Sequence, residues 1–222
     1  MNDFYDISNR NDTDKVSYHG YHFFYPKYFE QFRTNDFKML EIGYGGGASV
    51  KTWIEYFPNA DITVMDINVE VNYSDRCRVI KGDQSNISDL NKIIENIGFA
   101  KLILDDGSHN PIHQFDTFNH LFKHLLEPGG VYIIEDIEVS YWNPESTLYG
   151  YKSGYFNLVD SFKKYQEMIN SEFTGVKNLL DISTITFAQN CIIITKRTEE
   201  EKEYFDRLYR FHGCVDEVCH FG

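Results

Sequence analysis

The 222-residue sequence predicts an α/β fold, in which helices cover both faces of an open, mostly parallel β-sheet. Three observations support this prediction. Runs of β-branched and aliphatic residues alternate with segments of helical periodicity from residue 37 onward. A glycine-rich turn follows the first of these runs. Carboxylates end two later runs, and open α/β sheets bind ligands beyond the carboxyl ends of their strands.

Length, charge and cysteine content narrow the possible functions. A chain of this size can bury one sizeable core, so we expect a single domain over residues 1–222, with residues 1–36 as an N-terminal cap segment. The formal net charge of −13 disfavours nucleic acids and anionic membranes and favours a neutral substrate. No segment reaches the length of a membrane span, and four scattered cysteines suit reduced thiols. We therefore expect a soluble, cytoplasmic protein.

The N-terminal cap segment is rich in aromatic residues. Apolar and aromatic positions over residues 21–32 recur at near-helical spacing, which predicts a helix. Such a helix could roof a site at the sheet edge, and a purely structural role in the core is equally compatible with the pattern.

The first predicted strand, over residues 37–42, leads into a turn and then a helix that reaches about residue 57. The turn contains Gly43, Gly45 and Gly47, which allow a ligand to approach the backbone, and the helix start offers free N–H groups. With Ala48 the turn satisfies the G-x-G-x-x-A pattern of dinucleotide-binding proteins. With Glu41 it equally fits the E-x-G-x-G-x-G loop of S-adenosylmethionine enzymes.

Two further strand ends offer candidate cofactor ligands. Asp66 closes the second strand 23 residues after Gly43, where such folds hydrogen-bond a ribose. The third strand, over residues 77–81, leads to Asp83 and Gln84, whose side chains could reach an adenine edge. A simpler role for Asp83 is to cap a turn.

Two helices flank the fourth strand. We expect Ser88 to cap the first of them and Gly98 to end it, and we expect Pro111 to stand in the first turn of the second. These features are structural and imply no chemistry.

The fourth and fifth strands end in acidic pairs. The fourth runs into Asp105 and Asp106, followed by a Gly-Ser turn and His109, and the fifth ends in Glu135 and Asp136. Four carboxylates at neighbouring strand ends are costly to bury unless a cation compensates them. The sequence therefore predicts a divalent metal at this edge of the sheet.

The last third of the chain predicts a lid and a hairpin. Residues 138–154 are rich in aromatic, small and polar residues and are typical of a substrate lid loop. After a helix over residues 155–172, two β-rich runs over residues 182–187 and 191–195 are separated by a short turn, which predicts an antiparallel hairpin at the sheet edge. Most nicotinamide-binding domains are all parallel, so the hairpin favours the methyltransferase alternative.

These motifs together resemble the metal-dependent sugar O-methyltransferases of the macrocin and mycinamicin type, which are class I S-adenosylmethionine enzymes. The matching pieces span residues 13–142 and occur in family order. They are Thr13-Asp-Lys15 with His19 and Tyr21, Glu41-Ile-Gly-Tyr-Gly-Gly-Gly47, Gly82-Asp-Gln84, Asp105-Asp-Gly-Ser-His109, and Pro128-Gly-Gly-Val-Tyr-Ile-Ile-Glu135-Asp136 with Ser140-Tyr-Trp142.

The resemblance implies a Rossmann-like sheet of seven strands, mostly parallel with the last antiparallel. It implies that the metal, Mg²⁺ or Mn²⁺, is held by Asp106, Glu135 and Asp136, and that His109 is the base. The residues expected to bind S-adenosylmethionine are Glu41, Gly43, Gly45, Gly47, Asp66, Asp83, Gln84 and Asp105. The expected acceptor is a carbohydrate or glycoside, such as a rhamnose-type deoxyhexose in a glycan or glycosylated metabolite, and a homo-oligomer is compatible with the family.

Three other functions remain open. A catechol-type small-molecule O-methyltransferase shares the metal chemistry and differs in its acceptor. An NAD-dependent oxidoreductase would use His109 as the acid/base for a carbinol, but it does not explain the acidic strand ends. A non-catalytic nucleotide-binding domain would tolerate replacement of His109 and also leaves those carboxylates unexplained.

Overall fold

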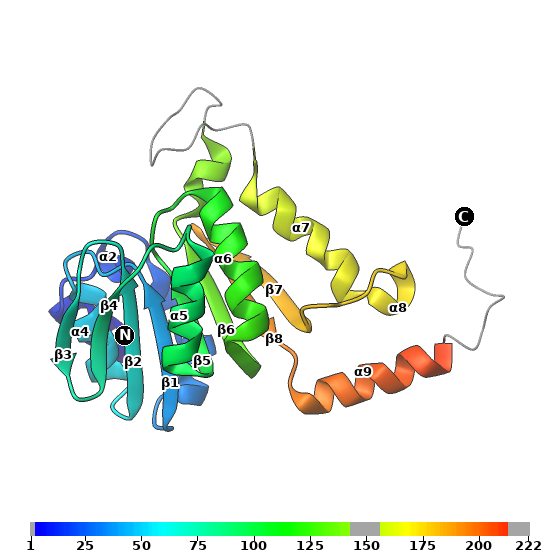
Figure 1. Cartoon of the computed structure of the whole chain (residues 1–222), viewed down its shortest axis with the longest axis horizontal. Helices are drawn as coiled ribbons and strands as arrows, with labels where there is room; N and C mark the ends of the chain where they lie inside the picture. Colours follow the sequence, from blue (N-terminus) through cyan, green and yellow to red (C-terminus); the bar gives the residue numbers. More distant parts are fainter. Residues whose placement is uncertain (1–2, 143–155, 213–222) are drawn as a thin grey trace.

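The computed structural model describes residues 3–142 and 156–212, in which eight strands form one mixed sheet of order β3-β4-β2-β1-β5-β6-β8-β7 (Figure 1). The strands are β1 (Phe37–Ile42), β2 (Ala60–Asp66), β3 (Val71–Ser74), β4 (Cys77–Lys81), β5 (Ala100–Asp105), β6 (Leu126–Glu135), β7 (Ile182–Ala188) and β8 (Cys191–Lys196). The central strands are parallel, β3 is antiparallel to β4, and β8 is antiparallel to both of its neighbours.

Most of the α-helices and shorter 3₁₀-helices pack on the two faces of this sheet, whereas the last two α-helices project beyond its β7 edge (Figure 1). The α-helices are α1 (Asp3–Arg10), α2 (Asp14–Ser17), α3 (Pro26–Phe29), α4 (Ala48–Tyr56), α5 (Ile87–Ile97), α6 (Pro111–His124), α7 (Leu158–Ile169), α8 (Ser171–Thr174) and α9 (Glu199–His212). The 3₁₀-helices are η1 (Tyr21–Phe23), η2 (Glu30–Phe32) and η3 (Ile137–Tyr141). Within these described helices, none has both the length and the apolar character needed to cross a membrane.

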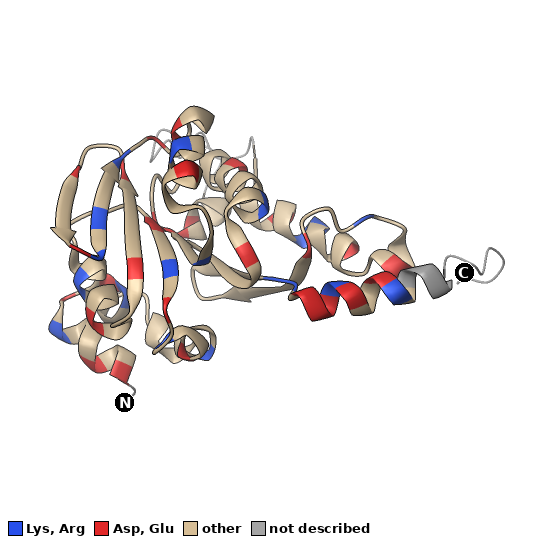
Figure 2. Cartoon of the chain, turned by 60° about the horizontal axis from the view of Figure 1, so that its bottom comes forward, with Lys and Arg blue, Asp and Glu red and all other residues tan. Residues whose placement is uncertain are grey.

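Two hydrophobic cores lie on opposite faces of the sheet. Helices α1, α3 and α4 contribute to the first core, and α5, α6 and α7 contribute to the second. Successive residues of a strand point to opposite faces, so Met39 of β1 enters the first core and Leu40 enters the second. Outside the cores, acidic and basic residues are interleaved along the ribbon, with three adjacent glutamates at the start of α9 (Figure 2).

The predicted fold class and hairpin agree with this architecture, while the strand count differs by one. Strand β8 inserts between β6 and β7, so the last strand is antiparallel as expected and β7 forms the edge. The additional strand is β3, whose four residues are all exposed. A strand without a buried face leaves no core pattern in the sequence, which explains why seven strands were predicted.

The predicted helix over residues 21–32 is wrong. The segment breaks into η1, α3 and η2, because Pro26 has no backbone N–H and starts a new helix instead of continuing one. Its rings nevertheless serve the first core, where Tyr21, Tyr25 and Phe29 are fully buried.

Two smaller expectations also need correction. The cap of α5 is Asn86 and not Ser88, because the Asn86 side chain accepts a hydrogen bond from the Ser88 backbone N–H. The helix expected over residues 155–172 is interrupted at Asn170, between α7 and α8. Most of the predicted lid, residues 143–154, lies outside the described part of the chain, and its first residues form η3.

The strand register brings the predicted functional segments together. Ile42 of β1 pairs with Asp105 of β5, and Asp105 pairs with Ile134 of β6. The turns that follow these strands therefore share one edge of the sheet. Helix α2 contributes Lys15 to this edge, since its ammonium contacts side chains at the ends of both β5 and β6.

Candidate active site

The glycine-rich turn after β1 forms one wall of a small cavity. Gly43 has a φ of +96°, and a Cβ added there would lie 2.1 Å from the Asp106 carbonyl oxygen, so only glycine fits. By contrast, a Cβ at Gly45 or Gly46 would meet no atom within 4 Å. The cavity of about 310 Å³ is lined by this turn together with Asp106 and the start of α2. The turn thus leaves room for a ligand against the backbone, as predicted.

Asp66 and Asp83 organise turns at the same edge. The Asp66 carboxylate accepts hydrogen bonds from the backbone N–H of Tyr44 (3.0 Å) and of Asn68 (2.7 Å). Asp66 therefore joins the end of β2 to the glycine-rich turn. Asp83 accepts from both the backbone N–H and the hydroxyl of Ser85, at 2.8 and 2.7 Å, which is the turn-capping role considered for it.

Gln84 and Asp105 lie below the site, where they are buried and pair with each other. The Gln84 amide donates to both Asp105 oxygens, at 3.1 and 3.2 Å, and its carbonyl oxygen accepts from the Ser108 backbone N–H at 2.6 Å. Burial raises the pKa of Asp105 to about 7, although Gln84 and the Gly107 N–H lower it. A Cβ at Gly107 would lie 2.2 Å from the Gln84 side chain. This pair holds the turn after β5 from beneath.

Glu41 is a second fully buried carboxylate. Within the described residues, neither of its oxygens has a partner in full hydrogen-bonding geometry. Burial raises the pKa of Glu41 to about 7, and the Lys15 ammonium, the Trp53 indole and Ser49 lower it. Glu41 therefore lies below the glycine-rich turn and within the electric field of Lys15.

Asp106, His109 and Asp136 converge above this buried layer. One ligand atom from each side chain lies within 4.8 Å of the other two. His109 Nε2 is 3.3 Å from an Asp106 oxygen and 3.6 Å from an Asp136 oxygen. His109 and Asp136 have φ values of +53° and +54°, a strained backbone that is typical of functional sites. The two carboxylates in this arrangement suit a divalent cation, and the imidazole lies close enough to act on a group bound beside it.

The protonation of His109 depends on these carboxylates. Burial alone lowers its pKa, but the hydrogen bond with Asp106 and the charges of Asp106, Asp136 and Glu138 outweigh burial and raise the pKa to about 9. With the charges of this chain alone, the imidazole is protonated at neutral pH. A group that neutralises the carboxylates is needed before His109 can accept a proton.

Lys15 and Glu135 form the inner side of the cluster. The Lys15 ammonium lies 2.8 Å from an Asp106 oxygen and 2.5 Å from a Glu135 oxygen, and the other Glu135 oxygen accepts from the Tyr25 hydroxyl at 2.7 Å. Lys15 and Glu135 are each only 1% exposed. The sequence argument assigned no role to Lys15, although the Thr13-Asp-Lys15 motif pointed to it. Thr13 caps α2 and accepts from the Lys15 backbone N–H.

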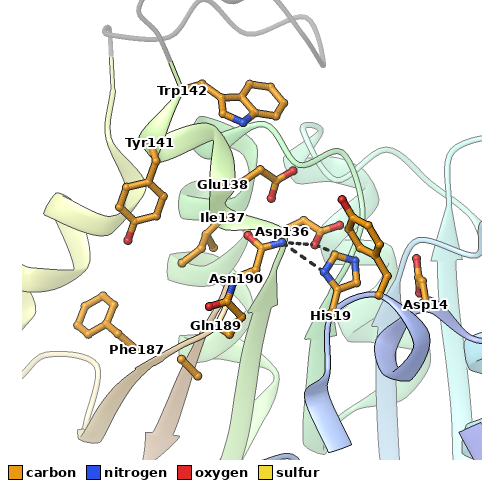
Figure 3. Close-up of a pocket in the computed structure, with 12 residues that line it drawn as sticks. Asp14, His19, Asp136, Ile137, Glu138, Tyr141, Trp142, Phe187, Gln189 and Asn190 are labelled. Carbon is orange, nitrogen blue, oxygen red and sulfur yellow. Dashed lines mark hydrogen bonds and ion pairs between the residues drawn. The ribbon is translucent and has the colours of Figure 1, made fainter.

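A larger cavity of about 1290 Å³ adjoins Asp136 (Figure 3). Its described aromatic lining comes from Tyr18, Tyr141, Trp142 and Phe187, and its carboxylates are Asp14, Asp136 and Glu138. None of the described lining residues is lysine or arginine. The cavity is therefore suited to a neutral or cationic ligand with apolar surface.

The β7–β8 turn orients Asp136 from the far side. Asn190, which has a φ of +52°, donates from its amide to an Asp136 oxygen at 2.8 Å (Figure 3). His19 Nε2 lies 3.6 Å from the same oxygen. His19 belongs to the motif that carries the family resemblance but had no predicted role, and Asn190 was not predicted, because a turn asparagine is common without function.

Comparisons with known proteins confirm the resemblance. No protein-family model matches the chain. Mycinamicin VI 2''-O-methyltransferase of Micromonospora griseorubida is 34% identical over 149 residues, which cover 63% of this chain and 37% of the relative. The 8-demethyl-8-alpha-L-rhamnosyl tetracenomycin-C 2'-O-methyltransferase of Streptomyces olivaceus is 33% identical over 144 residues, which cover 61% of this chain and 38% of the relative.

A solved structure extends the similarity to the fold. The MycE methyltransferase of the mycinamycin biosynthetic pathway, in complex with Mg, SAH and mycinamycin VI, matches with a TM-score of 0.77 and 28% identity, over 90% of this chain and 56% of that chain. The chain therefore has a Rossmann-like methyltransferase fold. It spans less than two fifths of the length of the two curated relatives that it matches.

Proposed function

We propose that the protein is an S-adenosylmethionine-dependent, divalent-metal-dependent O-methyltransferase that acts on a sugar hydroxyl. The observation that carries this proposal is the convergence of Asp106, His109 and Asp136 between the glycine-turn cavity and the larger cavity. The curated relatives, which are named as O-methyltransferases of glycosylated compounds, support it. We also propose a cytoplasmic location, which the buried free thiols of Cys77 and Cys191 support.

The cofactor part of the proposal assigns different tasks to the exposed and buried residues. We place the methionine portion of S-adenosylmethionine against Gly43 and Gly45, which line the smaller cavity, with Asp66 on the ribose and Asp83 near the adenine. Gly47 lies outside the lining of this cavity, and a Cβ there would lie 2.6 Å from the Tyr44 hydroxyl, so Gly47 serves the shape of the turn. The buried residues Glu41, Gln84 and Asp105 support these turns from below.

For the metal, Mg²⁺ or Mn²⁺, we assign Asp106 and Asp136, which converge with His109 and face the cavities, as ligands. Glu135 lies outside this convergent group and is 1% exposed, and we assign it as the inner ligand. The two Glu135 oxygens keep lone pairs beyond those used by Lys15 and Tyr25, so the donor set fits a hard cation that prefers oxygen ligands. When bound, the cation would lower the pKa of an acceptor hydroxyl and offset the carboxylate charges that keep His109 protonated.

The chain's own residues then perform the proton transfer and the positioning. His109 takes the hydroxyl proton at Nε2, the nitrogen that faces both carboxylates, as the acceptor oxygen forms its bond to the methyl carbon and the sulfur–carbon bond breaks. The sulfonium already activates the methyl group. The protein therefore has to deprotonate the acceptor oxygen and align it with the methyl carbon.

The larger cavity supports a neutral, ring-bearing acceptor. Its described lining combines aromatic side chains with carboxylates and offers no ammonium or guanidinium to a phosphate group. A deoxyhexose such as rhamnose, with neighbouring hydroxyls for the metal and an apolar face for the rings, fits these features. A catechol also has two adjacent hydroxyls and an apolar ring, and it is the second candidate.

The test combines binding and turnover. Calorimetry with S-adenosylhomocysteine and with NADH should detect binding of the former only. In the presence of S-adenosylmethionine and Mg²⁺, rhamnosides should be methylated and catechols should not. Excess chelator should abolish turnover and leave the affinity for S-adenosylhomocysteine within about threefold, because most of the lining of the proposed cofactor cavity comes from the glycine-rich turn and the start of α2. Turnover that persists in chelator would refute the metal mechanism, and methylation of catechols alone would reassign the acceptor.

A further inference from the structure

We propose that Lys15 is a built-in cation of the carboxylate cluster formed by Asp106, Glu135 and Asp136. Its ammonium occupies the inner side of this cluster, so the cluster is a site for one divalent cation instead of two. The inference rests on the metal-binding part of the proposed function. It adds a role for a residue to which the metal mechanism assigns none.

The placement of Lys15 is that of a bridging cation. Its ammonium lies between Asp106 and Glu135, at 2.8 and 2.5 Å from one oxygen of each, and it is 1% exposed. In two-metal sites, a carboxylate is commonly shared between the ions, which lie about 3.5–4 Å apart. Lys15 shares Asp106 with His109 in the same way, since one Asp106 oxygen contacts the ammonium and the other faces His109.

A charge count supports one exchangeable ion. Asp106, Glu135 and Asp136 carry a formal charge of −3 when ionised, and Lys15 reduces it to −2, which one divalent cation balances. Without Lys15 the three carboxylates keep their full negative charge, and one divalent cation does not balance it. Glu135 would then have no counter-ion on the inner side of the cluster, because the protonated His109 pairs with Asp106 and Asp136 on the outer side.

Two opposing effects follow from replacing Lys15 by a neutral residue. The carboxylates lose a donor that holds them in place, which weakens cation binding by the contribution of a hydrogen bond. They also lose a positive charge close to the ion, and repulsion of a doubly charged ion at such short range is the larger effect. The net prediction is tighter cation binding together with a less stable cation-free protein.

The experiment measures Mn²⁺ binding by calorimetry and electron paramagnetic resonance in the full chain, without cofactor or acceptor. Lys15→Met should bind Mn²⁺ at least about tenfold more tightly than the wild type, with binding of a second ion at high concentration. Its melting temperature should fall in chelator and rise more on addition of Mn²⁺ than that of the wild type. Lys15→Arg keeps the charge, so its affinity should stay within about threefold.

A matched control is Lys38→Met. Lys38 lies on β1, and its ammonium donates to the Ile97 carbonyl oxygen at 2.6 Å, so this variant removes the same charge away from the cluster. Its Mn²⁺ affinity should equal that of the wild type. A comparable gain in this variant would attribute the effect to net charge and overturn the proposal.

The remaining outcomes separate the inference from the function on which it rests. Equal or weaker Mn²⁺ binding by a folded Lys15→Met protein would overturn the inference while leaving the metal site intact. Absence of Mn²⁺ binding by the wild type would overturn the metal-dependent function itself. If Lys15→Met and the milder Lys15→Gln both unfold in chelator, Mn²⁺ should refold them, and failure to do so would also overturn the inference, because the ion replaces the missing charge.

Discussion

The acidic pairs at the ends of β5 and β6 have the same layout but different partners. In each pair the first acid, Asp105 or Glu135, points into the protein and is almost fully buried, while the second, Asp106 or Asp136, faces the cavities. The second acid of each pair lies just beyond its strand, since β5 ends at Asp105 and β6 ends at Glu135, so its side chain can turn toward the cavities.

The partners of the two buried acids show what each strand end contributes to the site. Asp105 is held by the neutral Gln84 amide, within the central sheet region. Glu135 is held by the Lys15 ammonium and the Tyr25 hydroxyl, both from the N-terminal segment. Asp105 is therefore satisfied within the central sheet region, whereas Glu135 needs a segment more than 100 residues away in sequence.

The largest expected effect separates the two acids of the β5 pair. Asp106→Asn removes a carboxylate that faces Lys15, His109 and the proposed metal, so turnover should fall by about three orders of magnitude or more. Asp105→Asn changes a residue beneath the site and should cost about tenfold, as for residues that orient ligands indirectly. Steady-state rates of both variants at saturating Mg²⁺ measure the contrast, and equal losses would contradict it.

The second largest effect concerns the two buried acids, whose replacement should lower the free energy of unfolding by different amounts. Glu135→Gln leaves the Lys15 ammonium with one carboxylate instead of two, and breaking a buried ion pair costs about 3–5 kcal/mol. Asp105→Asn disturbs only hydrogen bonds with a neutral partner and should cost about 1 kcal/mol. Urea denaturation in chelator gives both values. A larger loss for Asp105→Asn would reverse the comparison.

The two acids that face the cavities, Asp106 and Asp136, can be tested through the pH dependence of the free energy of unfolding, because both lie beside the protonated His109. Its folded pKa, raised to about 9, lies above the unfolded value of about 6.5, so the His109 interaction stabilises the protein fully below pH 6.5. That contribution is lost as the pH rises through 9, and in chelator it should amount to roughly 3 kcal/mol. His109→Gln should flatten this part of the stability profile. An unchanged profile would mean that Asp106 and Asp136 do not hold the protonated imidazole.

The smallest expected effect concerns a strand end without an ionic partner. Asp66 at the end of β2 is satisfied by backbone N–H groups, so Asp66→Ala should leave the sheet folded and weaken S-adenosylhomocysteine binding by about tenfold through a less ordered glycine turn. Calorimetry measures the affinity, and circular dichroism checks the fold. An unchanged affinity would separate Asp66 from the cofactor site.

Local motifs in the sequence made the sheet and the part of the site that follows its strands predictable. The glycine turn, Asp66 and the acidic pairs each follow a recognisable strand, and parallel strands bring such ends together. The contribution of Lys15 and Asn190 could not be predicted in this way. Their partners lie 91 and 120 residues away for Lys15 and 54 residues away for Asn190, so only the folded chain shows that they meet. The predicted helix over residues 21–32 was wrong for a local reason, because Pro26 starts a new helix within the segment.

The contact between Lys15 and Glu135 also constrains how the chain is made. At a synthesis rate of about 5–20 residues per second, the 120 residues that separate them take roughly 6–24 s to follow Lys15 out of the ribosome. During this interval Lys15 lacks Glu135, one of its two counter-ions, because only Asp106 emerges earlier, 91 residues after Lys15. The segment that carries Lys15 therefore docks late, and it stays exposed to proteases on the nascent chain while the residues between Lys15 and β6 are synthesised.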